Sequence, residues 1–241
     1  MSEPIRLSKQ VAALATCSRR DAEQYIEGGW VKVDGEIVEE PYFKVGDQQV
    51  IELHPRAELG KAEPATILLH KPAGVVIGDQ ADAANEMLTL ANRWPEDANP
   101  MRLLRRHFTR LVSPLPLDAS ASGMWVLSQS WQVLRKLDEE ADRIEQEFNV
   151  DVEGEIEPNG LTLLNHGLQI EGWRLPERKV SWQNETRLRF AIRDVRPGLI
   201  EAMCAAVGLQ ATALKRIRIG RVSMAKMQPG QWRLLAANEK F

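Results

Sequence analysis

Cysteine and histidine are scarce in this chain of 241 residues. It contains two cysteines, Cys17 and Cys204, and four histidines, and none of them is grouped at the spacing of a metal site. The same scarcity leaves no plausible Ser-His-Asp or Cys-His catalytic set. We therefore expect no metal, and we interpret each cysteine as a small buried hydrophobic residue, not as half of a disulfide.

Other common features are also missing. There is no glycine-rich phosphate-binding loop, so we expect no cofactor. No apolar run is long enough to span a bilayer, and residues 1–6 lack the pattern of a signal peptide, so we expect a cytoplasmic protein. The formal net charge is −3 and the isoelectric point is about 5.9. This balance excludes a protein that coats nucleic acid by bulk charge, but it allows a local basic face.

Residues 1–53 are expected to form a small domain of two helices followed by a small sheet. Ser8 is a candidate cap for the first helix, and the spacing of Ser18 and Asp21 predicts a capping box for the second. An Asp34-Gly35 pair between alternating segments predicts a β-hairpin. Residues 54–64, which are rich in proline and charge, are expected to form a linker.

Residues 65–241 are expected to form a larger α+β domain with a mostly antiparallel or mixed sheet and flanking helices. Apolar and alternating segments predict strands near residues 67–71, 148–152 and 211–219. Helices are expected after Ser130 and after Pro197, where a capping residue and a helix-initiating proline precede apolar residues at helical spacing.

The candidate active site is a lone carboxylate, Asp118, between two apolar segments. Residues 111–117 and 125–127 are apolar enough for buried strands, and small residues fill the loop between them. A carboxylate in such a loop can be shielded from water and still open to a cleft, which suits a nucleophile or a general base. The alternative is a turn aspartate that accepts hydrogen bonds from backbone N–H groups.

A dense basic run lies just before this segment, within residues 101–110. Its arginines, Arg102, Arg105 and Arg106, are candidates to line a nucleic-acid groove. A solvated face with no such role is an equally open alternative.

The first domain resembles the αL RNA-binding domain found in ribosomal protein S-four. The matching residues are Arg6-Leu7-Ser8-Lys9, Cys17-Ser18-Arg19-Arg20-Asp21-Ala22, Ile26, Gly29, Val31, Val33-Asp34-Gly35 and Val45-Gly46-Asp47. The resemblance implies that Lys9, Arg19 and Arg20 face RNA phosphates. Residues 1–53 contain six Lys/Arg against ten Asp/Glu, so a basic patch here must be one face of the domain.

The remaining motifs, in their order, resemble the bacterial ribosomal-RNA pseudouridine synthases of the RsuA/RluF type. The matching segments are Lys71-Pro72-x-Gly74-Val75, Leu117-Asp118-x-x-x-x-Gly123, Leu214-Lys215-Arg216-x-Arg218-Ile219-Gly220 and Gly230-x-Trp232-Arg233-x-Leu235. The resemblance implies a pseudouridine-synthase-like domain that isomerises uridine to pseudouridine in ribosomal or other structured RNA without a cofactor.

The same resemblance implies roles for particular residues. Asp118 is the expected catalytic residue. The residues expected to bind the substrate are Lys71, Phe148, Leu214 and Arg216. Lys215 and Arg218, in the last matching strand, are expected to bind RNA, as are Arg102, Arg105 and Arg106 of the basic run described above. The expected partner is RNA, with no membrane or metal, and the expected state is a monomer.

Several positions depart from the family motifs. Pro116 replaces an arginine beside the catalytic aspartate, and Ala121 replaces a hydroxyl residue. Gln146-Glu147-Phe148 stands where the family has Lys-x-Tyr, so the aromatic ring has no hydroxyl. Gly198 replaces an arginine that pairs with the catalytic carboxylate, and it has no side chain to do so.

Two functions therefore remain open from the sequence. One is a pseudouridine synthase with an altered active site, and the other is a non-catalytic RNA-binding relative. In the first case, the positive charge lost at residue 198 needs a replacement near Asp118. Lys71, Arg193 and Arg196 are the candidates.

Overall fold

The chain forms two compact units in a computed structural model that describes residues 4–60, 63–76, 86–170 and 172–241. The first unit comprises Met1–Pro64 and Arg102–Thr109, and the second comprises Ala65–Met101 and Arg110–Phe241. Part of the expected linker, residues 61–62, lies outside the described residues. Within those residues, no helix has the length and apolar character needed to cross a membrane.

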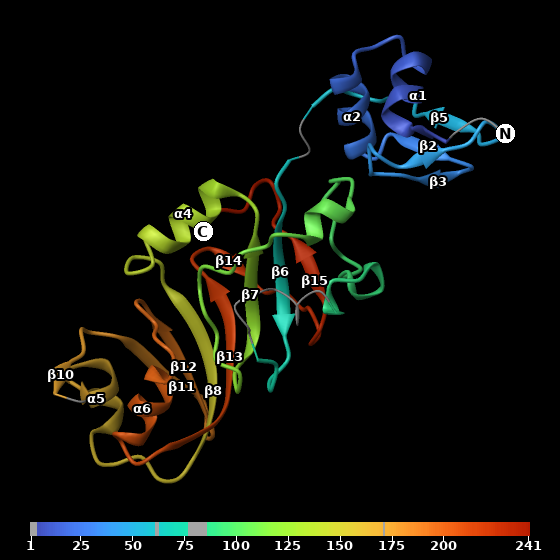
Figure 1. Ribbon diagram of the computed structural model, residues 1–241. Coiled ribbons are helices and arrows are strands. Elements are labelled where there is room, and N and C mark those ends of the chain that lie inside the picture. The colour runs from blue at the N-terminus through green and yellow to red at the C-terminus, as the bar shows by residue number, and fades with distance from the viewer. Residues whose placement is uncertain (1–3, 61–62, 77–85, 171) are drawn as a thin grey trace. The chain divides into compact units, whose positions relative to one another are not determined.

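Two helices and small sheets make up the first unit (Figure 1). Helices α1 (Leu7–Leu14) and α2 (Arg19–Glu27) pack on a core of apolar side chains that the following strands also contribute to. Strand β2 (Val31–Val33) pairs with both β3 (Glu36–Ile37) and β5 (Ile51–Leu53). A second pair joins β1 (Ile5–Arg6) to β4 (Lys44–Val45). The predicted order of two helices and then a small sheet is confirmed.

The two expected helix caps had different outcomes. The capping box is confirmed, because Asp21 N–H donates to Ser18 Oγ at 3.1 Å and Ser18 N–H donates to the Asp21 carboxylate at 3.3 Å. The cap at Ser8 was wrong. Helix α1 begins at Leu7, directly after β1, so Ser8 lies inside the first turn and its side chain is buried.

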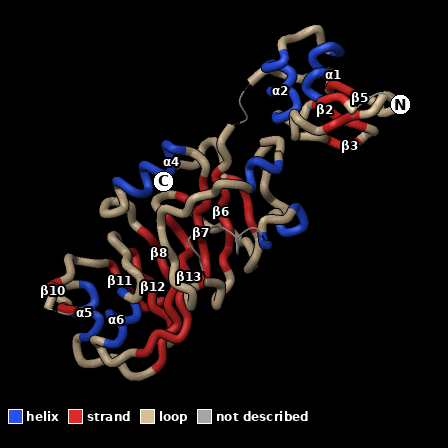
Figure 2. Tube along the Cα trace, in the orientation of Figure 1, coloured by secondary structure: helices blue, strands red, loops and turns tan. Residues whose placement is uncertain are grey.

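The second unit is built on an eight-stranded sheet (Figure 2). The strand order is β11-β12-β8-β13-β7-β6-β15, and β14 pairs with β13 off this path. Strands β7 and β13 run parallel, whereas the other described pairs of this sheet are antiparallel, so the sheet is mixed as predicted. The strands are β6 (Thr66–Lys71), β7 (Ser122–Ser128), β8 (Gln146–Glu153), β11 (Lys179–Asn184), β12 (Arg187–Ile192), β13 (Gln210–Ile219), β14 (Val222–Ser223) and β15 (Trp232–Leu234).

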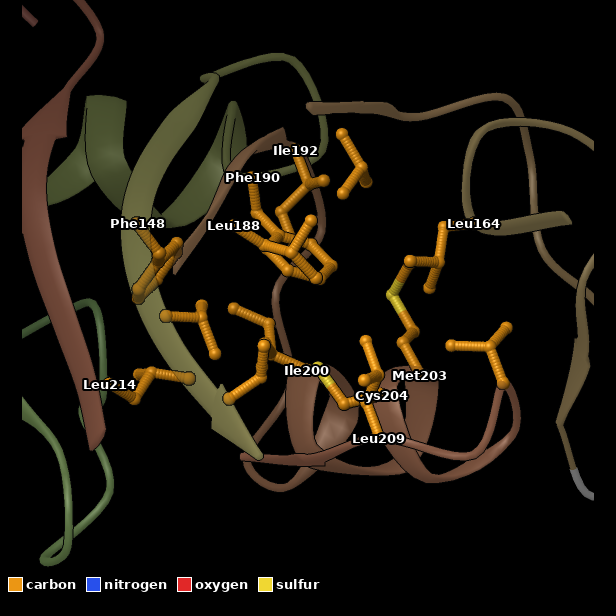
Figure 3. Packing of buried hydrophobic residues seen from close by; sticks show 14 of the residues in the cluster. Phe148, Leu164, Leu188, Phe190, Ile192, Ile200, Met203, Cys204, Leu209 and Leu214 are labelled. Atoms are coloured by element: carbon orange, nitrogen blue, oxygen red, sulfur yellow. The ribbon is translucent and has the colours of Figure 1, made fainter. Parts of the chain in front are cut away.

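Helices cover this sheet at two places. Helices α5 (Gly160–Asn165) and α6 (Leu199–Ala205) pack against β8, β11, β12 and β13. Figure 3 shows this core, in which Phe148 and Phe190 from the sheet face Ile200 and Met203 of α6. Helix α4 (Trp131–Glu139) packs on β7.

The short elements of the two units are η1 (Leu90–Asn92), η2 (Arg105–Phe108), β9 (Gln169–Ile170) and β10 (Trp173–Arg174).

One expected strand does not form. Residues 125–127 lie in β7 as predicted, but residues 111–117 are irregular apart from one bridge between Val112 and Ser128. Pro114 and Pro116 have no N–H group, so this segment cannot supply a continuous ladder of donors. Asp118 therefore follows a buried loop and precedes a strand.

Candidate active site around Asp118

The loop that carries Asp118 enters β7 through a glycine that no other residue can replace without strain. Asp118 C=O accepts a hydrogen bond from Ala121 N–H at 3.1 Å, which closes a tight turn. Gly123 follows with φ 110°, a conformation that favours glycine. A Cβ atom there would lie 2.2 Å from Arg216 O on β13, the parallel neighbour of β7. The close approach of these two strands sets where the loop ends.

Asp118 is one of the residues that line a small pocket open to solvent. Phe148 on β8 and Leu214 on β13 form apolar walls, and both were expected from the sequence to bind the substrate. The structure therefore brings three of the predicted site residues together from distant parts of the chain. The pocket is lined by Pro116, Leu117, Asp118, Phe148, Val195, Arg196, Pro197, Ile200, Glu201 and Leu214.

Gly198 contacts the Asp118 carboxylate through its backbone. Its N–H donates to Asp118 Oδ2 at 3.2 Å, and its φ of 75° places it directly before α6. The sequence analysis considered only side chains at this position, so it missed this donor. Within the described residues, Asp118 forms no ion pair with a Lys, Arg or His side chain.

Lys71 lies behind the loop, at the end of β6. Its ammonium group donates to the carbonyls of Pro72 at 3.1 Å, Val75 at 3.0 Å and Ala119 at 3.0 Å. Burial lowers the pKa of Lys71 to about 8, and the nearby Asp118 carboxylate opposes that shift. Lys71 is therefore a buried cation that fixes the loop next to Asp118, and it does not line the pocket.

Arg216 is a second buried cation behind the same loop. Only 1% of its surface is exposed. Its guanidinium donates to backbone carbonyls on both sides of Asp118 and to the side chain of Gln146. Burial lowers the pKa of Arg216, and the Asp118 charge opposes this shift. Arg216 was expected to bind the substrate. Its side chain does not line the pocket in this structure, so the structure does not support that contact.

The other two candidate cations differ in position. Arg196 lines the pocket, and its side chain is 79% exposed and lies 3.5 Å from Asp194. Arg193 contributes its backbone carbonyl to Arg178, and its side chain is absent from the pocket lining. Of the three replacements considered from sequence, Lys71 supports the loop and Arg196 lies at the pocket.

Arg218, which was expected to bind RNA, is part of an ion-pair network on the sheet. It contacts Glu147 at 2.7 Å and Glu145 at 2.6 Å, and Arg189 contacts Glu147 from the neighbouring strand. Burial alone would raise the pKa of Glu147, but hydrogen bonds from Arg189 and Arg218 outweigh burial and lower it. Lys215, on the same strand, is partly exposed. RNA binding by either residue stays a prediction.

The basic run lies in the first unit, although its neighbours in sequence belong to the second. The Arg102 guanidinium lies 4.7 Å from the ring centre of Trp30 and donates to Gly29 C=O. Arg105 and Arg106 contact acidic residues of the same unit. These contacts are Arg105 N–H with Glu39 at 2.9 Å, Arg105 with Glu40 at 4.0 Å, and Arg106 with Glu27 at 3.9 Å. The arginines of the basic run thus contact residues of the first unit, and these contacts could not be predicted from the local sequence.

The three residues of the S-four-like segment that were expected to bind RNA are exposed. Lys9 lies on α1, and Arg19 and Arg20 form the first turn of α2. Arg19 contacts Glu23 at 3.2 Å, one turn further along the helix. All three side chains can reach a phosphate backbone without rearrangement of the core, and their RNA contacts stay a prediction.

Comparison with known proteins defines the class of each unit. Residues 5–51 match the S4 domain family, so the first unit contains an S4 domain. The chain is similar over 96% of its length to the crystal structure of a pseudouridylate synthase, of which 96% is covered, with a TM-score of 0.59 and 21% identity. The second unit therefore has the fold of a pseudouridine synthase.

Named relatives extend this likeness over almost the whole sequence. An uncharacterized RNA pseudouridine synthase of Aquifex aeolicus is 26% identical, over 98% of this chain and 92% of the relative. Ribosomal small subunit pseudouridine synthase A of Vibrio cholerae is 25% identical, over 98% and 97%. The dual-specificity RNA pseudouridine synthase RluF of Escherichia coli is also 25% identical, over 98% and 77%. The resemblance to the RsuA/RluF type is confirmed.

Proposed function

We propose that this protein is an RNA pseudouridine synthase that acts on ribosomal RNA and uses Asp118 as its catalytic residue. The observation that carries the proposal is the pocket in which Asp118 lies beside Phe148 and Leu214. Full-length similarity to RNA pseudouridine synthases supports the reaction. The proposed setting is the cytoplasm and the proposed working state is a monomer.

We propose that the pocket receives a uracil base that has been turned out of its RNA strand. Phe148 and Leu214 are almost fully buried in the pocket wall, so we propose that their outer edges provide the apolar surface that the base contacts. Asp118, which lines the pocket, is then next to the sugar. We propose that the carboxylate acts there, either as a nucleophile or as a base.

The proposed reaction balances without a further reactant. The bond from N1 of uracil to C1′ of the ribose breaks, the base turns within the pocket, and a bond from C5 to C1′ forms. C5 loses a proton and N1 gains one, so substrate and product are isomers. The carboxylate is regenerated at the end.

Four surrounding groups support this role for Asp118. The Gly198 N–H fixes one carboxylate oxygen, and the buried Lys71 and Arg216 place positive charge behind the loop. Arg196, exposed at the pocket, is the group we propose to contact a phosphate of the flipped nucleotide. Lys71 and Arg216 belong to segments that match the family motifs, whereas the Gly198 N–H and Arg196 lie near the position where the family arginine is missing.

Tritium release from RNA labelled at C5 of uridine tests the proposal. Formation of the C5–C1′ bond expels the label into water, so release reports the reaction directly. We expect release from unmodified ribosomal RNA with the wild-type protein and none with Asp118→Asn. Asp138→Asn, a matched change at an exposed residue of α4, should keep the activity. No release from any ribosomal RNA, or equal release by Asp118→Asn, would contradict the proposal.

A further inference from the structure

Arg216 is held by acceptors on both sides of Asp118 in the sequence. Its Nη1 and Nη2 groups donate to Pro116 O at 2.9 Å and to Leu115 O at 3.3 Å, before the catalytic residue. Its Nε donates to Met124 O at 2.8 Å, after it. The fourth acceptor is the side-chain oxygen of Gln146, at 3.0 Å from Nη1. One planar group therefore spans the two ends of the loop.

No carboxylate pairs with this buried guanidinium among the described residues, which distinguishes Arg216 from Arg218 and Arg233. Arg218, two residues along the same strand, is paired with two glutamates. Arg233, which is also buried, is paired with Glu239. A buried charge without a counter-ion opposes folding unless hydrogen bonds compensate. The charge on Arg216 is thus directed only at the loop and at the Asp118 carboxylate beyond it.

We propose that Arg216 is the positioning residue of the Asp118 loop, and that Gln146 is its neutral partner. This inference rests on the proposed function, because it gives Arg216 the role of holding the catalytic Asp118 in position. The flat guanidinium offers several donors in fixed directions, so it can hold Leu115, Pro116 and Met124 together. Lysine at this position would keep the charge and lose that fixed geometry.

The amide at residue 146 fits this role. Gln146 is 2% exposed, and it accepts one bond from Arg216 without cancelling its charge. A carboxylate at 146 would pair with the guanidinium, neutralise it and draw it away from the loop carbonyls.

Arg216→Lys tests the positioning role. We expect kcat for tritium release to fall by about 100-fold, because a small displacement of a catalytic group has an effect of that order. KM should change by less than about threefold, since Arg216 does not line the pocket. Arg233→Lys is the matched control: it alters another buried arginine of the same sheet, and kcat should stay within about twofold of wild type. An equal loss of kcat in both variants would overturn the proposal.

Gln146→Glu provides a second test in a variant that is expected to fold as stably as the wild-type protein. The change keeps the side-chain shape and adds a counter-ion to Arg216. If Arg216 only stabilises the fold, the new ion pair should leave kcat unchanged. If Arg216 positions the loop and directs its charge at Asp118, kcat should fall by at least about tenfold while the melting temperature is kept. Unchanged kcat in Gln146→Glu would contradict the proposal.

Hydrogen exchange separates this inference from the proposed function. The amide of Ala121, bonded to Asp118 C=O, reports how firmly the loop is held. It should exchange at least about tenfold faster in Arg216→Lys than in wild type, and at the wild-type rate in Arg233→Lys. If the wild-type protein releases no tritium, the proposed function fails, and faster exchange only in Arg216→Lys still supports a loop held by Arg216. Unchanged exchange would overturn the inference whatever the activity.

Discussion

At the scale of single residues, the surroundings of Asp118 combine a backbone N–H donor with two buried cations. Gly198 has no side chain, yet its backbone N–H reaches the Asp118 carboxylate. Lys71 and Arg216 lie behind the loop, and each is buried and bonded to loop carbonyls. The departures from the family motifs at Pro116 and Gly198 therefore leave Asp118 with hydrogen-bonding and charged neighbours.

The buried Lys71 predicts a pH dependence of stability. Its pKa falls from the ordinary 10.5 to about 8 in the folded protein, chiefly because of burial. Between these two values the unfolded chain binds more protons than the folded one, so the contribution of Lys71 to the free energy of unfolding rises with pH. Below about pH 8 both states are protonated and the contribution is constant.

Denaturant unfolding of wild type and Lys71→Met between pH 7 and pH 10 measures this effect. The difference in unfolding free energy between the two proteins should change in favour of wild type as pH rises above about 8. Because both proteins share all other titrating groups, the comparison isolates Lys71. A difference that does not vary with pH would show that the amine has its ordinary pKa in the fold.

At the scale of elements, the approach of β7 to β13 is the tightest constraint on the site. Gly123→Ala would place a methyl group 2.2 Å from Arg216 O, which is backbone and cannot turn aside. Together with the positive φ, this should lower the free energy of unfolding by about 2–4 kcal/mol.

Gly230→Ala is the control for that prediction. Gly230 also has a positive φ, of 84°, but a Cβ atom there meets nothing within 4 Å. The cost should therefore be conformational strain alone, about 1 kcal/mol. Chemical denaturation of both variants measures the difference. Equal destabilisation would contradict the account of the close β7 and β13 approach.

Local sequence predicted the elements whose signals are local. The spacing of Ser18 and Asp21 gave the capping box, and the alternation around Phe148 gave β8. Residues 111–117 were predicted to form a strand because most of them are apolar, but two prolines prevent strand pairing. Ser8 was predicted to cap a helix, but the pairing of β1 with β4, which fixes the start of α1, joins residues far apart in sequence.

The site itself was predictable only in part. Asp118, Phe148 and Leu214 could be found because family motifs mark them, and the fold brings them to one pocket. The Gly198 contact spans 80 residues of sequence and comes from the backbone, so no residue type signals it. The partners of Arg102, Arg105 and Arg106 likewise come from residues 27–40, through contacts that spacing along the chain does not encode.

At the scale of the whole molecule, an S4 domain and a domain with the pseudouridine synthase fold share one chain whose net charge is −3. Binding to RNA must then depend on local basic faces. The exposed Arg19 and Arg20 are candidates in the S4 domain, because they place two positive charges side by side in the first turn of α2.

The double variant Arg19→Ala with Arg20→Ala tests this face. Its affinity for ribosomal RNA should be weaker, and the slope of log affinity against log salt should be shallower by about one to two units. Arg135→Ala with Lys136→Ala, a pair of exposed cations on α4, serves as the control and should keep the wild-type slope. Equal slopes in all three proteins would exclude the Arg19 and Arg20 face as an RNA contact.

The central claim is that the Asp118 pocket forms pseudouridine in ribosomal RNA. The most direct measurement is a map of pseudouridines in the ribosomal RNA of source cells that lack this gene, complemented with either wild type or Asp118→Asn. We expect at least one uridine to be modified with wild type and unmodified both without the gene and with Asp118→Asn. Identical maps in the three cases would contradict the claim.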